Sequence, residues 1–364
     1  ERSRPARISE VDSPALILRN VRQHNLDIPL LSIPLDRLVV VTGVSGSGKS
    51  TLLDDVLYRN LLRGRGRPAD EPGVVASLEG GSLIGEAFLL SQSPLGRSIR
   101  SNIVTYLSLY TAVRSLLART PRARALGLEP GAFSFNVPGG RCEACQGLGT
   151  VTVEMHFLSD LEIACEACRG RRFREDVLEV TWRGRNIIQI LDLTVSEALE
   201  FLEDLPETAA RLSPLVEVGL DYLRLGQSTA TLSGGEAQRL RVASLLAEGR
   251  SARRAAAAGR KRSGGASSGP GTNLFIFDEP TAGLHPRDIH RLLGSLRGLL
   301  ALGHAVIAVE HQLDFIAAAD HVIDLGPGAG AQGGRLVYAG GLEGLTRVAD
   351  SATGRALAAR GALP

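Results

Sequence analysis

The amino-acid sequence predicts an α/β fold, in which a mixed, mostly parallel sheet with flanking helices is interrupted by an inserted helical subdomain. Three observations predict it. A β-branched run at residues 38–42 and apolar runs at 273–277 and 305–309 are typical of strands buried on both faces. Helical patterns lie between such runs, and strand–helix–strand alternation implies parallel strands. The sequence pattern changes between residues 96 and 225, a stretch that contains all four cysteines.

The 364 residues, with 44% hydrophobic content, allow a substantial buried core. We expect residues 1–95 and 226–364 to form the two parts of that core, around an inserted subdomain at 96–225. Residues 250–271 are rich in Ala, Gly, Ser and Arg without an apolar period, which predicts a flexible loop.

The remaining elements follow from local periodicity. Short apolar runs at 15–30 predict antiparallel strands at a sheet edge. Further strands are expected at 151–157 and 177–182, and helices at 51–62, 106–117, 196–202 and 287–302.

Bulk properties restrict the partners and the compartment. There is no N-terminal apolar run and no stretch of about 18 apolar residues, so we expect a cytoplasmic chain without a membrane partner. The net charge is only +2 and aromatic residues make up 4%, so nucleic acid would have to be bound by local basic patches rather than by aromatic stacking.

A glycine-rich loop follows the first buried strand. Residues 43–50 read Gly-Val-Ser-Gly-Ser-Gly-Lys-Ser, which matches a phosphate-binding loop between a strand and a helix. Glycines let backbone N–H groups converge on phosphate oxygens, and the helix N-terminus adds about half a positive charge. Lys49 is expected to reach the β and γ phosphates, and Ser50 to bind Mg²⁺. The candidate ATP-binding residues here are Gly43, Ser45, Gly46, Gly48, Lys49, Ser50 and Thr51.

An acidic pair ends the strand at 273–277. Asp278 is expected to hold Mg²⁺ with Ser50, and Glu279 to act as general base on the attacking water. A simple helix cap is the alternative, disfavoured because Pro280 and the residues after it continue as a loop.

Ser233, Gly234, Gly235 and Glu236 open a helix. The Ser–Glu spacing fits a capping box. A cap does not explain two successive glycines, which cost a helix about 1 kcal/mol each. Bare N–H groups at a helix start suit a phosphate, so Ser233, Gly234 and Gly235 are also candidate nucleotide ligands.

Along the chain, the phosphate loop at 43–50, the glycine-rich helix start at 233–236 and the acidic pair at 278–279 follow one another. This order resembles that of the ATP-binding-cassette (ABC) ATPases, which have a P-loop core and an inserted signature subdomain. The resemblance implies that Gln92 couples the nucleotide to the insert, that residues 283–288 form the D-loop, and that His311 contacts the γ-phosphate. Taken alone, His311 and Gln92 would be unremarkable. Two cassettes of this superfamily enclose ATP between one cassette's phosphate loop and the other's signature motif, so a second cassette is an expected partner.

The cysteines form two Cys-x-x-Cys pairs separated by 19 residues: Cys142 with Cys145, and Cys165 with Cys168. This spacing fits a closed four-cysteine Zn²⁺ site at the base of a hairpin. Metal would then supply folding energy to a small insertion without its own core. Disulfides are the alternative, and His156 is a rival ligand in the middle of the hairpin.

Arginines surround the module: Arg141, Arg169, Arg171, Arg172 and Arg174. Guanidinium groups suit phosphate, so this cluster is a candidate DNA-binding surface. The alternative is a solvated basic surface.

The strings at 91–102, 133–149, 218–227 and 322–327 resemble the UvrA family of excinuclease ATPases, in its C-terminal cassette with the zinc-bearing signature subdomain. The resemblance implies an ATP-driven sensor of distorting lesions in double-stranded DNA, which dimerises and loads a UvrB-like partner but is not a nuclease. The first cassette of that family is absent here. The alternatives are a half-fragment that hydrolyses ATP only with a second cassette and a paralogue in resistance to DNA-binding drugs.

Overall fold

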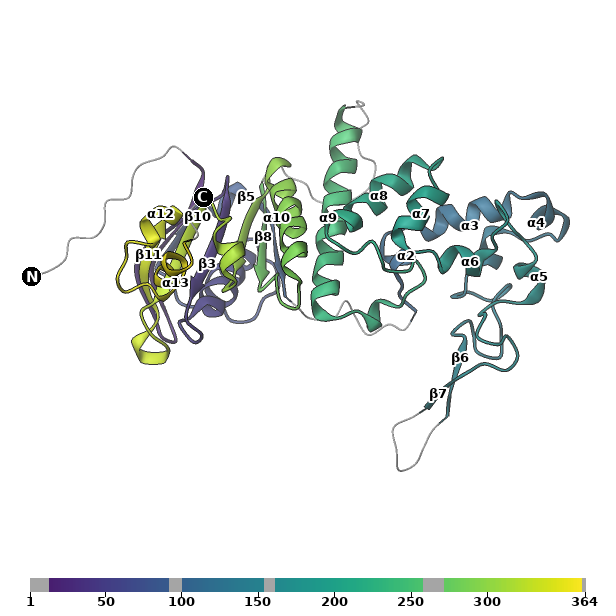
Figure 1. Ribbon diagram of the computed structural model, residues 1–364, viewed down its shortest axis with the longest axis horizontal. Coiled ribbons are helices and arrows are strands. Elements are labelled where there is room, and N and C mark those ends of the chain that lie inside the picture. The colour runs from purple at the N-terminus through teal and green to yellow at the C-terminus, as the bar shows by residue number, and fades with distance from the viewer. Residues whose placement is uncertain (1–12, 92–99, 154–160, 258–271, 362–364) are drawn as a thin grey trace, which may run out of the picture. The chain divides into compact units, whose positions relative to one another are not determined.

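The computed structural model describes residues 13–91, 100–153, 161–257 and 272–361. The chain forms two compact units, one of Glu1–Gln92 with Ala252–Pro364 and the other of Ser93–Ser251. Figure 1 labels their elements and colours them by position in the chain. The second unit extends beyond residue 225, where the insertion was expected to end, because the helix that carries the signature motif groups with it.

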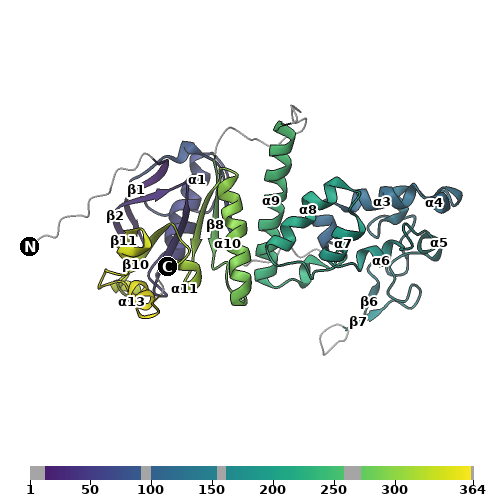
Figure 2. The same cartoon turned by 45° about the horizontal axis from the view of Figure 1, so that its top comes forward.

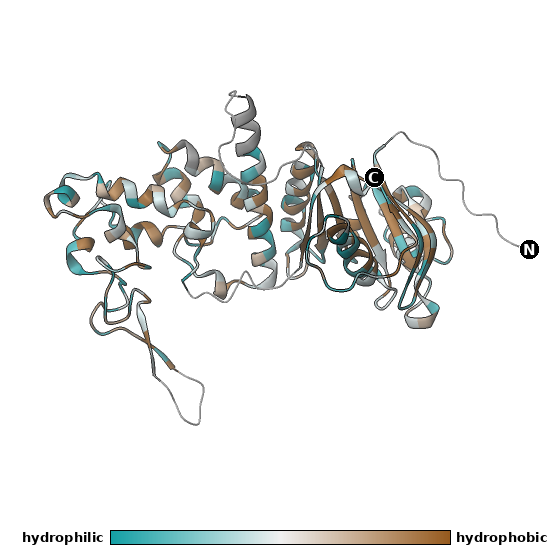
Figure 3. Ribbon diagram, turned by 180° about the vertical axis from the view of Figure 1, so that it is seen from behind, coloured by the Kyte–Doolittle hydropathy of each residue, from teal (hydrophilic) through white to brown (hydrophobic). Residues whose placement is uncertain are grey.

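A six-stranded main sheet, in the order β11-β10-β3-β9-β8-β5, organises the first unit. All neighbours pair in parallel except β10 and β11, which confirms the predicted mixed, mostly parallel sheet. The strands are β3 (Leu38–Gly43), β5 (Ile84–Leu90), β8 (Thr272–Asp278), β9 (Ala305–Val309), β10 (His321–Gly326) and β11 (Arg335–Gly340). Figure 3 shows these strands as mostly hydrophobic, as expected of a sheet covered on both faces.

A second, antiparallel sheet in the order β2-β1-β4 joins β1 (Ala15–Gln23), β2 (Leu26–Pro34) and β4 (Ser77–Glu79) (Figure 2). The antiparallel pairing predicted at 15–30 is confirmed, although these strands form a sheet of their own. Along β2 the buried side chains alternate with accessible ones, and Ile28 and Ile33 are fully buried.

The helix after the phosphate loop runs through η1 (Thr51–Tyr58), with the wider π-helical winding, into α1 (Arg59–Gly64). Its predicted apolar face is buried: Leu52, Leu53, Val56 and Leu57. The other helical elements of this unit are η2 (Gly81–Leu83), α10 (Pro286–Ala301), α11 (Leu313–Ile316), η5 (Gly330–Gln332), α12 (Leu342–Leu345) and α13 (Ala352–Ala359).

The second unit is helical, with one hairpin of β6 (Thr150–Val153) and β7 (Leu161–Ala164) in its described part. Its longer helices are α3 (Tyr110–Ala118), α7 (Val195–Phe201) and α8 (Pro206–Glu217), and α9 (Gly234–Ala257) leaves it after Ser251. Shorter helical elements are α2 (Ile103–Tyr106), α4 (Pro121–Ala125), η3 (Pro130–Phe133), α5 (Glu175–Leu178), α6 (Ile187–Leu191) and η4 (Thr229–Thr231).

Three predicted elements differ from the structure. Residues 177–182 were expected to be a strand, but α5 covers the first two of them. Glu175 and Asp176 in its first turn favour a helix start over a strand. The predicted helix at 106–117 is interrupted by Ser108, whose φ is 58°. Part of the predicted loop at 250–271 is helical, since α9 continues to Ala257 through a run of good helix formers. The rest of that loop, residues 258–271, lies outside the described residues.

Candidate nucleotide site and cysteine centre

The phosphate loop, residues 43–50, leaves the carboxyl end of β3 along a path that requires glycine at two positions. Gly43 has φ 134°, and a Cβ there would lie 2.1 Å from the carbonyl oxygen of Leu325. Gly48 has φ 99°, and a Cβ there would lie 2.6 Å from Leu26. These two glycines are therefore required by the turn itself, since L side chains strain at such angles.

Lys49 lies folded over its own loop. Its ammonium group donates to the carbonyl oxygens of Gly43 at 2.8 Å and Val44 at 2.9 Å. Burial lowers the pKa of Lys49, and the nearby carboxylates of Glu279, Asp324 and Asp278 oppose that change. The cation is thus held among weak local acceptors that a phosphate could replace.

The acidic pair lies at the carboxyl end of β8, as predicted. Burial raises the pKa of Asp278, and the charge of Glu279 adds to the effect. Glu279 adopts a left-handed φ of 46°, a strained geometry for a residue with a side chain. Its Oε1 lies 3.6 Å from Nδ1 of His311, which follows β9. We refer to Lys49, Asp278, Glu279 and His311 as the catalytic edge.

Sequence reasoning did not identify Glu310, although a lone carboxylate at the end of an apolar run was a visible signal. Glu310 is 0% exposed. Its Oε1 accepts the backbone N–H of Thr281 at 2.8 Å, and its Oε2 accepts those of His311 at 3.1 Å and Gln312 at 3.3 Å.

The phosphate loop also has a support that the sequence did not suggest. The side-chain amide of Asn25 donates to the carbonyl oxygens of Gly46 at 3.2 Å and Gly330 at 3.1 Å. The N–H of Gly330 donates to Gly46 at 3.1 Å, and that of Gly334 to Ser47 at 3.1 Å. A second glycine-rich segment, after β10, therefore fixes the loop's shape.

The remaining candidates of the phosphate loop are accessible. Ser45, Gly46 and Ser50 are exposed, and Thr51 is half-buried. Gln92 lies outside the described residues.

The signature motif belongs to the second unit. The N–H of Ser233 donates to Glu236 at 2.8 Å and the N–H of Glu236 to the Ser233 hydroxyl at 3.3 Å, so the predicted capping box is confirmed. Gly234 and Gly235 start α9 directly after it. The hydroxyl of Tyr222 donates to Glu236 at 2.6 Å, a contact that the sequence did not suggest. Burial, followed by this bond, raises the pKa of Tyr222 to about 12.

The four cysteines converge as predicted. Cys142, Cys145, Cys165 and Cys168 are buried and unpaired by disulfides, with all four sulfur atoms within 4.8 Å of one another. Sulfur atoms bound to Zn²⁺ at about 2.3 Å in a tetrahedron lie about 3.8 Å apart; here Cys142 and Cys165 are 4.0 Å apart, and Cys145 and Cys168 3.7 Å.

The backbone around the cysteines also suits thiolates. The N–H groups of Gly149 and Arg172 donate to the sulfur atoms of Cys145 and Cys168, at 3.2 and 3.4 Å. The residues present therefore fit a structural zinc ion. His156, the rival ligand, lies outside the described residues.

The arginines around this module are largely engaged by neighbours. Arg171 pairs with Glu175, Arg174 with Asp176 and Arg141 with Glu143, and the Arg141 side chain is only 13% exposed. Arg172 lies over the ring of Phe135, 5.6 Å from its centroid. Arg169 is exposed. Any phosphate binding by this cluster would compete with these pairs.

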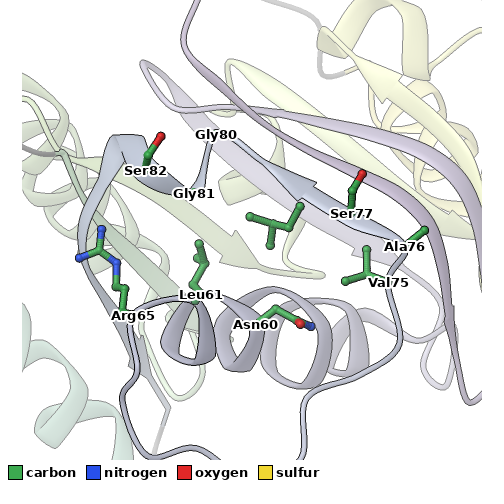
Figure 4. A pocket seen from close by; sticks show the side chains of 11 residues that line it. Asn60, Leu61, Arg65, Val75, Ala76, Ser77, Gly80, Gly81 and Ser82 are labelled. Atoms are coloured by element: carbon green, nitrogen blue, oxygen red, sulfur yellow. The ribbon is translucent and has the colours of Figure 1, made fainter.

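Figure 4 shows a hollow of about 600 Å³ between α1 and β4, lined by residues such as Asn60, Arg65 and Ser77. None of the predicted site residues lines it. The candidate nucleotide site is instead an open loop at a sheet edge. Among the described helices, none is both long enough and apolar enough to cross a membrane.

No protein-family model matches the chain. It is 46% identical, over 89% of its length, to UvrABC system protein A of Methanothermobacter thermautotrophicus, and 47% identical over 89% to that of Thermus thermophilus. The chain is thus similar to members of the UvrA family over nearly nine tenths of its length. It covers 32% of the length of each of these two relatives. The crystal structure of UvrA2 from Deinococcus radiodurans aligns with 100% of this chain and 41% of that one, at 41% identity and a TM-score of 0.81. The resemblance inferred from the motifs is thereby confirmed.

Proposed function

We propose that the chain is the C-terminal ATP-binding cassette of a UvrA-type protein, which hydrolyses ATP and recognises distorted double-stranded DNA. The observation that carries the ATPase assignment is the convergence of Lys49, Asp278, Glu279 and His311 at one edge of the main sheet. The relatives named UvrABC system protein A support the assignment to DNA repair.

Each residue of the catalytic edge has a chemical task. Lys49 exchanges its two carbonyl partners for the β- and γ-phosphate oxygens. Ser50 and Asp278 would hold Mg²⁺, which would neutralise phosphate charge. Glu279 accepts a proton from the attacking water, and His311, 3.6 Å away, orients that carboxylate and meets the γ-phosphate. Gln92 would link this site to the second unit.

A complete site needs a second cassette. Gly234 and Gly235 present N–H groups at the start of α9, and Ser233 adds a hydroxyl, which suits the γ-phosphate of a nucleotide held by another cassette's phosphate loop. The second cassette would come from the rest of a longer protein or from another chain, and the assembly would be a dimer that loads a UvrB-like partner.

The cysteine centre, with Zn²⁺, would hold the hairpin of β6 and β7 in a shape that contacts DNA. With much of the arginine cluster engaged in ion pairs, we expect recognition to depend on the deformability of the duplex more than on base edges.

The experiment that tests the function measures ATP hydrolysis and binding to matched duplexes with and without a bulky adduct. It uses the chain alone and with a candidate first cassette, at two salt concentrations. ATP turnover with adduct preference is the expected result. Equal binding to both duplexes in the presence of the first cassette would contradict damage recognition, and the absence of turnover there would contradict the ATPase assignment.

A further inference from the structure

Glu310 connects the strands that build the catalytic edge. It directly follows β9, and its backbone N–H donates to the carbonyl oxygen of Val41 in β3 at 3.1 Å. Its side chain accepts the N–H of Thr281, two residues after Glu279, at 2.8 Å. The same carboxylate accepts the N–H of His311 at 3.1 Å. One residue is therefore bonded to the strand before the phosphate loop, to the turn after the acidic pair, and to the histidine.

Burial makes this arrangement informative. A carboxylate that is 0% exposed is costly unless its oxygen atoms are hydrogen-bonded, and both oxygens of Glu310 are used. An apolar side chain would fill the space at lower cost in desolvation. It could not, however, hold three N–H groups that belong to two separate loops.

The backbone that Glu310 holds is strained at Glu279. Glu279 has a left-handed φ of 46°, and its backbone N–H donates to Val309, the last residue of β9, at 3.0 Å. Such a conformation persists only where the surroundings fix it. The bond from Thr281 to Glu310 closes the turn on the far side of Glu279, so the strained residue is fixed on both sides.

We propose that Glu310 is a positioning residue for ATP hydrolysis, whose buried carboxylate fixes the spacing of Glu279 and His311 by binding the backbone N–H groups of Thr281, His311 and Gln312. This inference rests on the proposed ATPase function. Glu310 does not touch the nucleotide in this account, so it should affect turnover and leave nucleotide affinity unchanged.

The test compares Glu310→Gln with the wild-type chain, both combined with the second cassette. The substitution is nearly isosteric, but one oxygen becomes an NH₂ group that faces N–H donors whichever way the amide turns. The expected result is a kcat about tenfold lower with Kd for ATP within about twofold. Amide hydrogen exchange should also become faster in residues 279–284 and 310–313 and stay unchanged in β3.

Asp320→Asn is the matched control. Asp320 also accepts a backbone N–H, from Leu38 at 2.9 Å, but at the amino ends of β3 and β10, away from the catalytic edge. An unchanged kcat in Glu310→Gln, or an equal loss in Asp320→Asn, would overturn the proposal. If the wild-type chain hydrolyses no ATP, the proposed function fails. Amide hydrogen exchange at residues 279–284 then decides by itself whether Glu310 holds the loop after the acidic pair. If Glu310→Gln does not fold, Glu310→Asp is measured instead, because it keeps the charge but cannot span both loops.

Discussion

The catalytic edge and the cysteine centre hold chemical groups by opposite means. The catalytic edge stands on a core of buried aliphatic side chains that includes Val39, Leu52 and Ile307. Among the described residues, the buried cluster at the cysteine centre consists of the four cysteines. The first is therefore expected to keep its shape without a ligand, whereas the second depends on what binds its sulfur atoms.

Removal of the metal should have the largest effect on stability, and that effect should be confined to the cysteine centre. Structural Zn²⁺ contributes about 10–16 kcal/mol of apparent binding free energy in small metal-dependent folds. Cys165→Ser or chelation should therefore release the hairpin of β6 and β7, with fast amide exchange there and loss of bound zinc.

The control for metal removal is the main sheet, where exchange should not change. A metal-free protein with a protected hairpin would contradict the assignment, as would a main sheet that unfolds on chelation.

At the catalytic edge, Glu279→Gln should slow ATP hydrolysis without changing the fold. A general base contributes about 10²–10⁴-fold to a rate, so kcat should fall by that factor. Kd for ATP should stay close to the wild-type value, because the phosphate loop is built by Gly43, Gly48 and Asn25 instead. Residual turnover above a tenth of wild type would assign the base to another residue; thermal unfolding at the wild-type temperature is the control.

The contrast also explains what the sequence could predict. Motifs with fixed local spacing, such as the phosphate loop and the paired cysteines, were placed correctly because their geometry is local. Glu310 and Asn25 were missed because their partners, Thr281 and Gly330, are distant in the chain. The strand expected at 177–182 failed since apolar alternation over a few residues does not distinguish a strand from a short helix whose first turn is acidic.

A smaller effect is expected from pH at the catalytic edge. Burial raises the pKa of Asp278, so its carboxylate takes up a proton at a higher pH than an exposed aspartate would. Because Mg²⁺ needs the charged form, Mg²⁺-dependent ATP affinity should fall as the pH is lowered towards that raised pKa, by up to about tenfold per pH unit below it.

Asp278→Asn tests the origin of this pH dependence, because the amide cannot titrate. Its Mg²⁺-dependent affinity should be weak and constant over the same range, measured by titration with a fluorescent ATP analogue. A pH profile that persists in Asp278→Asn would show that another group titrates, and the cysteine centre should be monitored in parallel by its zinc content.

The smallest effect is expected at Tyr222, where the second unit supports the signature motif. Its hydroxyl donates to Glu236, but the residue is 54% exposed, so in Tyr222→Phe water can take the place of the hydroxyl as a donor to Glu236. A single hydrogen bond contributes about 0.5–1.5 kcal/mol, and the capping box with Ser233 remains, so α9 should stay folded. We expect kcat with a second cassette to fall about two- to fivefold, with no change in ATP binding by this chain's own phosphate loop. Because Tyr222 and that loop lie in different units, a loss of affinity in Tyr222→Phe would mean that the signature motif acts on the nucleotide of its own chain.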